Sequence, residues 1–326
     1  MSMLFSCFFH IYFCFIIKNT LTTIQNCCMM FKTSYYVMKG VIQMTIDVHV
    51  HPAFYDPICK SPEQVDTRKK IMGYDLMSPF PLELVNKQLA YAKIDRLVLL
   101  PEDSSTIDGA VAITNEDIAT LVRLDPQRYI GFASVDPNRP DALEVLRYAF
   151  DTLGLKGLKL HPAKDHFYPD DPKLFPIYEL CLARNLPITF HCGMSWQPNT
   201  YMKYCHPFQF EEIAIRYPEL RINLAHFGFP WVTETAAIIL KYPNVYADTA
   251  GCYMDCPEQF FEHIFMKQMG PLWIEHNIRE KILFGSNSPR FRPQRIKRGL
   301  ESLPLSEETK AMILGENAVK FLGLEG

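Results

Sequence analysis

Closely spaced histidines are the residues of this chain best suited to chemistry. The segment "IDVHVHP" (residues 46–52) places His49 and His51 two positions apart at the end of a β-branched, apolar run. Alternation along a strand puts Asp47, His49 and His51 on one face. Buried imidazoles are costly without partners, and a divalent metal satisfies two of them, with Asp47 as an acceptor behind a ligand. The segment therefore predicts a metal site more strongly than it predicts core histidines.

Two other histidines follow similar apolar runs. "LPITFHCG" ends in His191, and "INLAHFG" presents His226. We expect His191 to be a third metal ligand that reaches the site from the same rim. His226 is expected to act as a catalytic acid or base or to polarise the substrate, because an imidazole with a pKa of about 6.5 exchanges protons near neutral pH.

A further run, "LKGLKLHP", places Lys159 and His161 on one face. Lys159 is expected to bind a substrate carboxylate, to pair with a buried acid or, when carbamylated, to bridge two metals, and the sequence does not choose among these. His161 is expected to line the site, either as a substrate contact or as structural support. Asp248, at the end of another run, is either an alternative acid or a partner for Lys159.

These polar residues fall at the ends of eight short apolar runs that alternate with helical patterns. The expected strands are Ile46–His51, Arg96–Leu100, Tyr129–Val135, Leu155–His161, Leu186–Cys192, Leu220–Phe227, Val245–Ala250 and Lys281–Asn287. The expected helices are Leu82–Lys93, Asn115–Leu124, Asp141–Leu153, Leu174–Arg184, Phe208–Tyr217, Val232–Tyr242, Cys256–His276 and Ser306–Leu322. This alternation predicts an α/β fold, a (β/α)8 TIM barrel whose active site lies at the carboxyl ends of the strands. A doubly wound open sheet is the alternative, but no glycine-rich turn follows the first strand. The segment Pro52–Pro81 is expected to be a long loop over the site.

Composition limits the partners and the compartment. The chain has 326 residues, 48% hydrophobic and 21% charged, with a net charge of −3, so it is an ordinary globular protein without a nucleic-acid-binding surface. Its cysteines show no CxxC and no disulfide spacing, which indicates a reducing, cytoplasmic location.

The first 43 residues differ from the rest because they contain no Asp or Glu. Residues 3–17 form an apolar stretch, yet this is shorter than the roughly 20 residues of a membrane span, and the basic start and clear cleavage site of a secretory signal are missing. The segment is a membrane-associating stretch, a signal sequence or an extension that is not part of the fold. We favour the last reading, with residues 44–326 as one catalytic barrel that has no membrane partner.

The ordered set HxH, Lys-x-His, His, His and a final "FGS-x-x-P" resembles the amidohydrolase superfamily. It is most similar to the amidohydrolase-related group that includes γ-resorcylate and aminocarboxymuconate semialdehyde decarboxylases. The resemblance covers residues 45–323 and implies a barrel of the metallo-dependent hydrolase type, often dimeric or tetrameric. It also implies one divalent metal, usually Zn²⁺, bound by His49, His51 and His191, and a catalytic role for His226.

The resemblance fails at one position. The family motif "FGSD-x-P" ends the eighth strand with an aspartate that ligates the metal and accepts a proton, and this chain reads "GSNSP" there, with Asn287. A neutral amide ligates weakly and cannot be a base. Asn287 is therefore expected to occupy the metal-binding and catalytic position, where it would ligate the metal weakly and could not act as a base. Trp196 and Arg290 are expected to bind the substrate beside Asn287, and Arg290 would do so by a bidentate contact with the substrate's carboxylate.

Three functions follow from these residues. The main expectation is a metal-dependent hydrolase that acts on a small organic acid, amide or ester. The alternative is a metal-dependent, non-oxidative decarboxylase of an aromatic or muconate-type acid. An alternative of another class is a barrel impaired by Asn287 that serves as a small-molecule binding protein.

Overall fold

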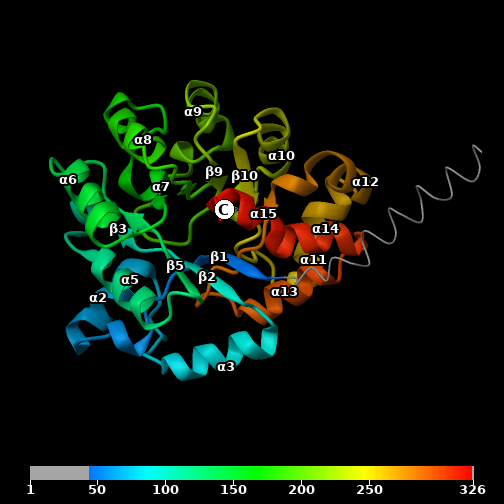
Figure 1. The fold of residues 1–326 in the computed structure, drawn as a ribbon. Coiled ribbons are helices and arrows are strands. Elements are labelled where there is room, and N and C mark those ends of the chain that lie inside the picture. Colours follow the sequence, from blue (N-terminus) through cyan, green and yellow to red (C-terminus); the bar gives the residue numbers. More distant parts are fainter. Residues whose placement is uncertain (1–43, 325–326) are drawn as a thin grey trace, which may run out of the picture. The chain divides into compact units, whose positions relative to one another are not determined.

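Parallel strands alternate with helices throughout residues 44–324, the part of the chain that the computed structural model describes (Figure 1). The barrel strands are β1 (Ile46–Val50), β2 (Arg96–Leu99), β5 (Tyr129–Gly131), β6 (Ala133–Ser134), β7 (Leu158–Leu160), β8 (Ile188–Phe190), β9 (Ile222–Leu224), β10 (Val245–Asp248) and β11 (Ile282–Leu283). They pair in the orders β1-β2-β5 and β11-β10-β9-β8-β7-β6, and only Phe132 separates β5 from β6. The barrel closes where the Val48 amide donates to Phe284 O at 2.9 Å and the His51 amide to Ser288 O at 2.8 Å. The predicted (β/α)8 barrel is confirmed.

The strands are shorter than predicted because side chains take over backbone hydrogen bonds at their carboxyl ends. Lys281–Asn287 was expected as one strand, but β11 ends at Leu283. Beyond it, the Gly285 amide donates to Thr249 Oγ1 at 3.1 Å, and the Ser286 amide to Asp47 Oδ1 at 2.9 Å. The β1–β2 register also shifts between Asp47 and Val50, so the pairing along this strand is irregular.

Helices occupy each of the segments in which they were expected. Those in the expected segments are α3 (Leu82–Ala92), α5 (Asn115–Leu124), α6 (Ala142–Arg147), α8 (Phe175–Leu182), α9 (Glu211–Arg216), α10 (Val232–Lys241), α11 (Pro257–Phe261), α12 (Pro271–Trp273), α14 (Glu307–Ala311) and α15 (Asn317–Leu322). Local caps fix their starts: Thr114 and Asp117 form a reciprocal capping box at α5, and Ser306 accepts from the Thr309 amide at 3.2 Å at α14.

Several local predictions are wrong. The segment expected as a loop, Pro52–Pro81, contains α2 (Pro62–Met72), whose N-cap Ser61 accepts from the Gln64 amide at 3.2 Å. The single helix expected over Cys256–His276 is interrupted at Gly270, which has a φ of 96° and precedes Pro271. The elements that sequence reasoning missed are β3 (Glu102–Asp103), α4 (Ser105–Asp108), β4 (Val111–Ile113), α7 (Pro162–Asp165) and α13 (Pro293–Glu301).

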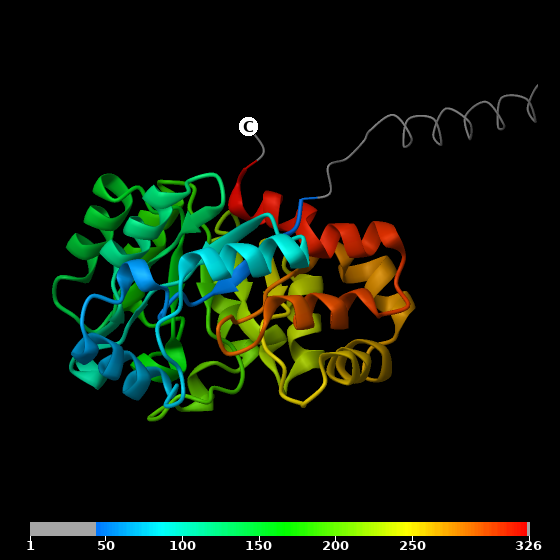
Figure 2. The ribbon, with the colours of Figure 1, turned by 90° about the horizontal axis from the view of Figure 1, so that it is seen from below.

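The apolar core lies between the strands and the surrounding helices, and a smaller cluster lies under α15. Ala318, Phe321 and Leu322 of α15 pack against residues of β1, β2 and β11, among them Ile46 and Leu283. In Figure 1 this helix lies in front of the strands near the centre of the view, and in Figure 2 it lies above them. It covers the end of the barrel at which β1 begins, which leaves the opposite end for the residues that follow the strands.

The expectation that residues 1–43 are an extension concerns a segment outside the described residues. The compact unit that contains the barrel begins at Met44. Within residues 44–324, none of the helices combines the length and the apolar character that crossing a membrane requires.

Candidate functional site

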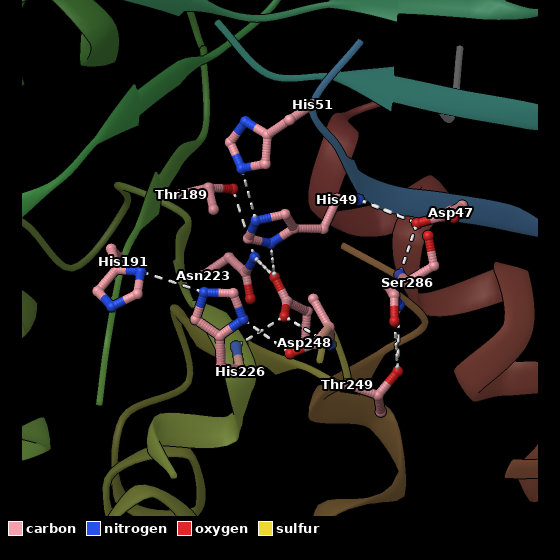
Figure 3. Close-up of polar contacts among 12 residues, drawn as sticks. Asp47, His49, His51, Thr189, His191, Asn223, His226, Asp248, Thr249 and Ser286 are labelled. Carbon is pink, nitrogen blue, oxygen red and sulfur yellow. Dashed lines mark hydrogen bonds and ion pairs between the residues drawn. The ribbon is translucent and has the colours of Figure 1, made fainter. Parts of the chain in front are cut away.

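Four of the predicted histidines converge at the carboxyl ends of the strands (Figure 3). The ring centroid of His49 lies 5.2 Å from that of His51 and 4.8 Å from that of His226. The His191 ring lies 4.8 Å from His226. All four are buried, so residues separated by up to 177 positions in the sequence form one polar cluster at the barrel mouth.

The hydrogen bonds of His49 and His51 fix where each imidazole carries its proton. His49 Nδ1 lies 3.0 Å from Asp248 Oδ2, and His51 Nδ1 lies 3.1 Å from Leu100 O. A carboxylate and a carbonyl only accept, so each neutral ring is protonated at Nδ1 and has a lone pair at Nε2. The two Nε2 atoms face each other at 3.2 Å. Two facing lone pairs repel, and a cation between or beside them removes that repulsion.

The same reasoning fixes the tautomers of His226 and His191. His226 Nδ1 donates to Ala250 O at 2.7 Å, which leaves its Nε2 as an acceptor 3.1 Å from His191 Nδ1. His191 must therefore donate from Nδ1, and its lone pair lies on Nε2. That Nε2 is buried and has no hydrogen-bond partner among residues 44–324. His191 thus offers the same kind of donor atom as His49 and His51.

Protonation of a histidine does not supply the cation that these lone pairs require, because burial disfavours a charged imidazole. It lowers the pKa of His49, His51 and His191 well below the usual value, and neighbouring charged groups lower it further. Three neutral imidazoles with free or facing Nε2 lone pairs are the donor set that a divalent transition metal takes. These three histidines therefore fit the metal predicted from the sequence.

His226 differs from the expectation in its pKa. Burial, and next to it the charge of His49, lowers the pKa of His226 from 6.5 to about 3. The ring is consequently neutral at pH 7, whereas the sequence argument had assumed an imidazole that titrates near neutral pH. A proton received at Nε2 is weakly held, which suits transient proton transfer better than permanent charge.

Asp248 orients the cluster from behind. Its Oδ2 accepts from His49 Nδ1 and from Asn223 Nδ2 at 2.7 Å, and its Oδ1 accepts from the amides of His226 at 2.8 Å and Ala250 at 3.0 Å. Suitable ligand atoms of His49, His226 and Asp248 lie within 4.8 Å of one another, which is a spacing that a metal also fits. We favour the Nε2 set, because the carboxylate already accepts four N–H groups and supports His49. Asp248 makes no hydrogen bond to Lys159, so the expected direct pairing is absent.

Asp47 does not take the role suggested for it. Its Oδ1 accepts from the backbone amides of His49 at 3.2 Å and Ser286 at 2.9 Å, and no imidazole donates to it. Burial raises the pKa of Asp47 to about 7. The residue therefore holds the β1 and β11 ends together, while Asp248 from β10 supports the ligand.

Unusual backbone conformations present these side chains. His226 has a φ of 62° and a ψ of 21°, a left-handed conformation that is rare outside glycine and typical of functional positions. Gly193, two residues after His191, has a φ of 83°, and a Cβ there would lie 2.2 Å from Phe229 O. The chain after β8 and the chain after β9 therefore approach each other more closely than any side chain at position 193 permits.

Asn287 lies in the turn that follows β11, four residues beyond the end of that strand, and not at the strand end where it was expected. Its φ is 60°, a conformation that asparagine and aspartate adopt more readily than most residues. Its amide donates to His49 O at 2.9 Å, and the residue lines the same cavity as His51, His191 and His226. The turn thus carries position 287 to the candidate metal site by backbone contacts that do not involve its side chain.

The four residues expected to bind substrate line this cavity as well. They are Lys159, His161, Trp196 and Arg290. Lys159 is buried, and burial lowers its pKa to about 8. His161 stacks on His191 with ring centroids 4.0 Å apart and accepts from the Lys164 amide at 3.2 Å. His161 therefore supports a proposed ligand as well as lining the site.

The outer part of the cavity is built from aromatic contacts. Trp196, 56% exposed, stacks on Tyr253 with centroids 5.9 Å apart. Arg290 lies over the Tyr74 ring at 4.5 Å and donates to Met72 O at 3.0 Å. These contacts hold both side chains at the cavity in defined orientations.

Sequence reasoning missed Glu102, Gln197, Tyr74 and Tyr253, which also line the cavity. Glu102 lies two residues beyond the second expected strand, so its position at a strand end was a usable signal. Tyr74 and Gln197 are in connecting segments, where no periodic pattern indicates which side chain turns inward.

Comparison with known proteins shows what this chain is similar to. A curated relative, 2-amino-3-carboxymuconate-6-semialdehyde decarboxylase of Dictyostelium discoideum, is 27% identical over 247 residues. The matched segment covers 65% of this chain and 66% of that relative, slightly less than two thirds of its length.

Solved structures share the fold. An uncharacterized TIM-barrel protein of Bordetella bronchiseptica has a TM-score of 0.68 and 20% identity, with 86% of this chain and 98% of that one covered. A dihydroxybenzoic acid decarboxylase of Polaromonas, solved with bound manganese and the inhibitor 2-nitroresorcinol, has a TM-score of 0.57 and 17% identity over 87% of this chain and 98% of that one. The profile of the amidohydrolase family matches residues 46–324. The chain belongs to the amidohydrolase family of enzymes.

Proposed function

We propose that the protein is a metal-dependent, non-oxidative decarboxylase of a small carboxylic acid. The observation that supports this most is the composition of one cavity. It combines the Nε2 lone pairs of a metal site with two cationic side chains, Lys159 and Arg290, and with the neutral Asn287 where the family motif has an aspartate. The proposed ligands are His49, His51 and His191, with Asn287 as a weak fourth.

The metal would act as a Lewis acid that polarises a carboxylate or the oxygen next to it. Which metal is bound is open: the donor set suits Zn²⁺, and a similar fold has been solved with manganese. Lys159 and Arg290 would bind and orient the acid. When the carbon–carboxylate bond breaks and CO₂ leaves, the carbon takes a proton. His226 is neutral at pH 7, so it would relay this proton from a water molecule: Nε2 would take the proton in place of its hydrogen bond from His191 Nδ1, and the low pKa of the imidazole would let it pass the proton on readily.

Decarboxylation fits this cavity better than hydrolysis, the main expectation from the sequence. Hydrolysis needs a group that accepts a proton from an attacking water, and the Asn287 amide cannot do so. Loss of CO₂ needs a bound carboxylate and a proton donor, and neither requirement depends on position 287. Two of the compared proteins, the Dictyostelium relative and the Polaromonas enzyme, are named as decarboxylases.

The test uses metal-free protein reconstituted separately with Zn²⁺ and Mn²⁺. Aromatic and muconate-type acids are offered, and CO₂ release is followed beside hydrolysis of matched esters and amides. We expect stoichiometric metal and CO₂ release that disappears in His226→Asn, while the metal content of that variant is retained. Ester or amide hydrolysis without CO₂ release would contradict the proposal.

The Asn287→Asp variant separates an active enzyme from an impaired barrel. Because the backbone at position 287 already suits an aspartate, the substitution should leave the fold intact. We expect the unaltered protein to be active and the variant to bind metal more tightly. Activity and metal binding that appear only in Asn287→Asp would favour the alternative of a binding protein.

A further inference from the structure

A second cavity lies behind the segments that carry the candidate metal site. This rear cavity has a volume of about 320 Å³ and is bounded by helices α3 and α13, which are neighbours on the barrel (cyan and orange in Figure 2). Its floor is formed by buried apolar side chains of β1, β2 and α3, namely Val50, Leu97, Val85 and Leu89. Its rim is open to solvent at Gln88 and Arg292. An apolar cavity of roughly 150 Å³ takes up benzene, so the rear cavity has room for a fused two-ring molecule.

The rear cavity and the cavity of the candidate site share two wall segments. His51 lines the candidate site, and the residue before it, Val50, lines the rear cavity. Asn287 and Arg290 line the candidate site, and the two residues between them line the rear cavity. The two segments are joined because the His51 amide donates to Ser288 O at 2.8 Å. A molecule in the rear cavity would therefore contact the backs of both segments that present side chains to the candidate metal site.

One buried polar atom at the rear cavity has no partner. Gln294, in the first turn of α13, lines the cavity, and its Oε1 makes no hydrogen bond within the described part of the chain, residues 44–324. Buried polar atoms are normally satisfied, and an amide oxygen can only accept. An N–H or O–H donor would satisfy this atom. Arg292, the cation at the rim, is exposed and can be hydrated, so the cavity does not require an anion.

We propose that the rear cavity binds a neutral, mainly apolar two-ring molecule with one N–H or O–H donor, and that this molecule tightens metal binding at the candidate site. The rings pack against Leu89 and Leu97, and the donor bonds to Gln294 Oε1. The bound molecule opposes movement of Val50 and Ser288 away from the candidate site, so the residues on either side of them stay in place. This inference goes beyond the proposed function, because it assigns a second ligand to a different cavity.

Indole and 1-methylindole are matched probes of the donor, because only indole has an N–H and neither offers a nitrogen lone pair to a metal. Each is titrated calorimetrically into the full chain, with and without Zn²⁺, and we expect one molecule of indole to bind per chain. In Gln294→Leu, the ratio of the affinity for indole to the affinity for 1-methylindole should fall about 2- to 10-fold, the contribution of a neutral hydrogen bond. An unchanged ratio would overturn the assignment of the donor's partner to Gln294.

A second substitution tests the place of binding independently of Gln294. Val85→Phe puts a larger side chain into the rear cavity, so we expect it to abolish binding of both probes. Val145→Phe is the matched control, since it makes the same change on α6 at the edge of another cavity, and it should leave both affinities unchanged. No binding of indole to the unaltered protein, or undiminished binding to folded Val85→Phe, would overturn the site.

Metal affinity tests the coupling between the two cavities. Zn²⁺ is titrated into metal-free protein with and without saturating indole, and we expect indole to tighten zinc binding about 5-fold or more. Linkage requires that zinc tighten indole binding by the same factor, and the effect should be absent in Val85→Phe. Bound indole that leaves the zinc affinity unchanged or lowers it would overturn the coupling. Indole binding requires neither metal nor turnover, so failure of the rear cavity and failure of the proposed decarboxylase activity are separate results.

Discussion

The Asp248→Asn substitution is expected to destabilise the barrel and to weaken its metal site, because every acceptor of this carboxylate is in use. Its two oxygens accept four N–H groups at 2.7 to 3.0 Å. An amide has one oxygen, so two of these N–H groups would face an NH₂ group instead. A stranded buried donor costs about 1–3 kcal/mol, so two predict a loss of roughly 2–6 kcal/mol in the free energy of unfolding.

Metal binding is expected to fall about 10- to 100-fold in the same variant, the usual effect of losing the carboxylate behind a ligating imidazole. Without Asp248, the His49 ring can protonate at Nε2, the atom that is proposed to bind the metal. The measurement is a calorimetric titration of metal-free protein with Zn²⁺ and Mn²⁺, beside urea unfolding of the metal-free form. Measuring both separates loss of the ligand's orientation from loss of the fold.

Asp47→Asn is the matched control for this experiment. Asp47 is equally buried and lies on the same strand as His49, but its Oδ1 accepts from two backbone amides and from no imidazole among residues 44–324. An asparagine can keep both bonds through its oxygen, so we expect a small change in stability and unaltered metal affinity. Folded Asp248→Asn protein that binds metal as tightly as the unaltered chain would refute the role assigned to Asp248.

Three further predictions concern parts of the fold that support the site. Arg68→Met should lower the free energy of unfolding by about 3–5 kcal/mol, because it removes the buried cation that contacts the Asp117 carboxylate at 2.7 Å and leaves exposed Lys60 at 3.6 Å as the nearby positive charge; urea unfolding measures this, and a loss below about 1 kcal/mol would contradict it. Gly193→Ala should cost more than about 1 kcal/mol in a thermal melt, since its φ is 83° and its Cβ would meet Phe229 O at 2.2 Å; an unchanged Tm would be inconsistent with that close approach. Burial raises the pKa of Asp165 well above 3.8, so the folded state retains a proton that the unfolded state loses, and stability falls as pH rises through that window. Asp165→Asn should therefore gain stability relative to the unaltered protein as pH increases above 4, and parallel pH profiles of the two would exclude this linkage.

Much of the site follows from residue type and position at strand ends. His49, His51, His191 and His226 were identifiable because polar side chains at the carboxyl ends of apolar runs must meet in a barrel. The same rule located Lys159 and position 287. Glu102 was missed although it lies close to the end of an expected strand, because the sequence does not show which groups surround it.

The errors have two causes: side chains distant in sequence replaced local backbone interactions, and local helix signals were outweighed by prolines. The last strand ends early because Thr249 and Asp47 bind the amides that would have continued it. The helix over Pro62–Met72 was read as a loop because prolines outweighed its Ser61 cap and the Gly73 that ends it with a φ of 67°. Local propensity alone did not decide either case.

The sequence by itself determined the barrel, the family and the histidines of the candidate metal site, since these depend on a repeating apolar pattern and on residues placed at its ends. The tertiary structure decided the chemistry at each atom. Asp248, from the seventh barrel strand, fixes the proton of His49, and burial lowers the pKa of His226 to about 3. Glu102 and Lys159 face one cavity without pairing. Tautomer, protonation and unmet hydrogen-bonding capacity depend on which groups lie within a few ångströms, and only folding brings those groups together.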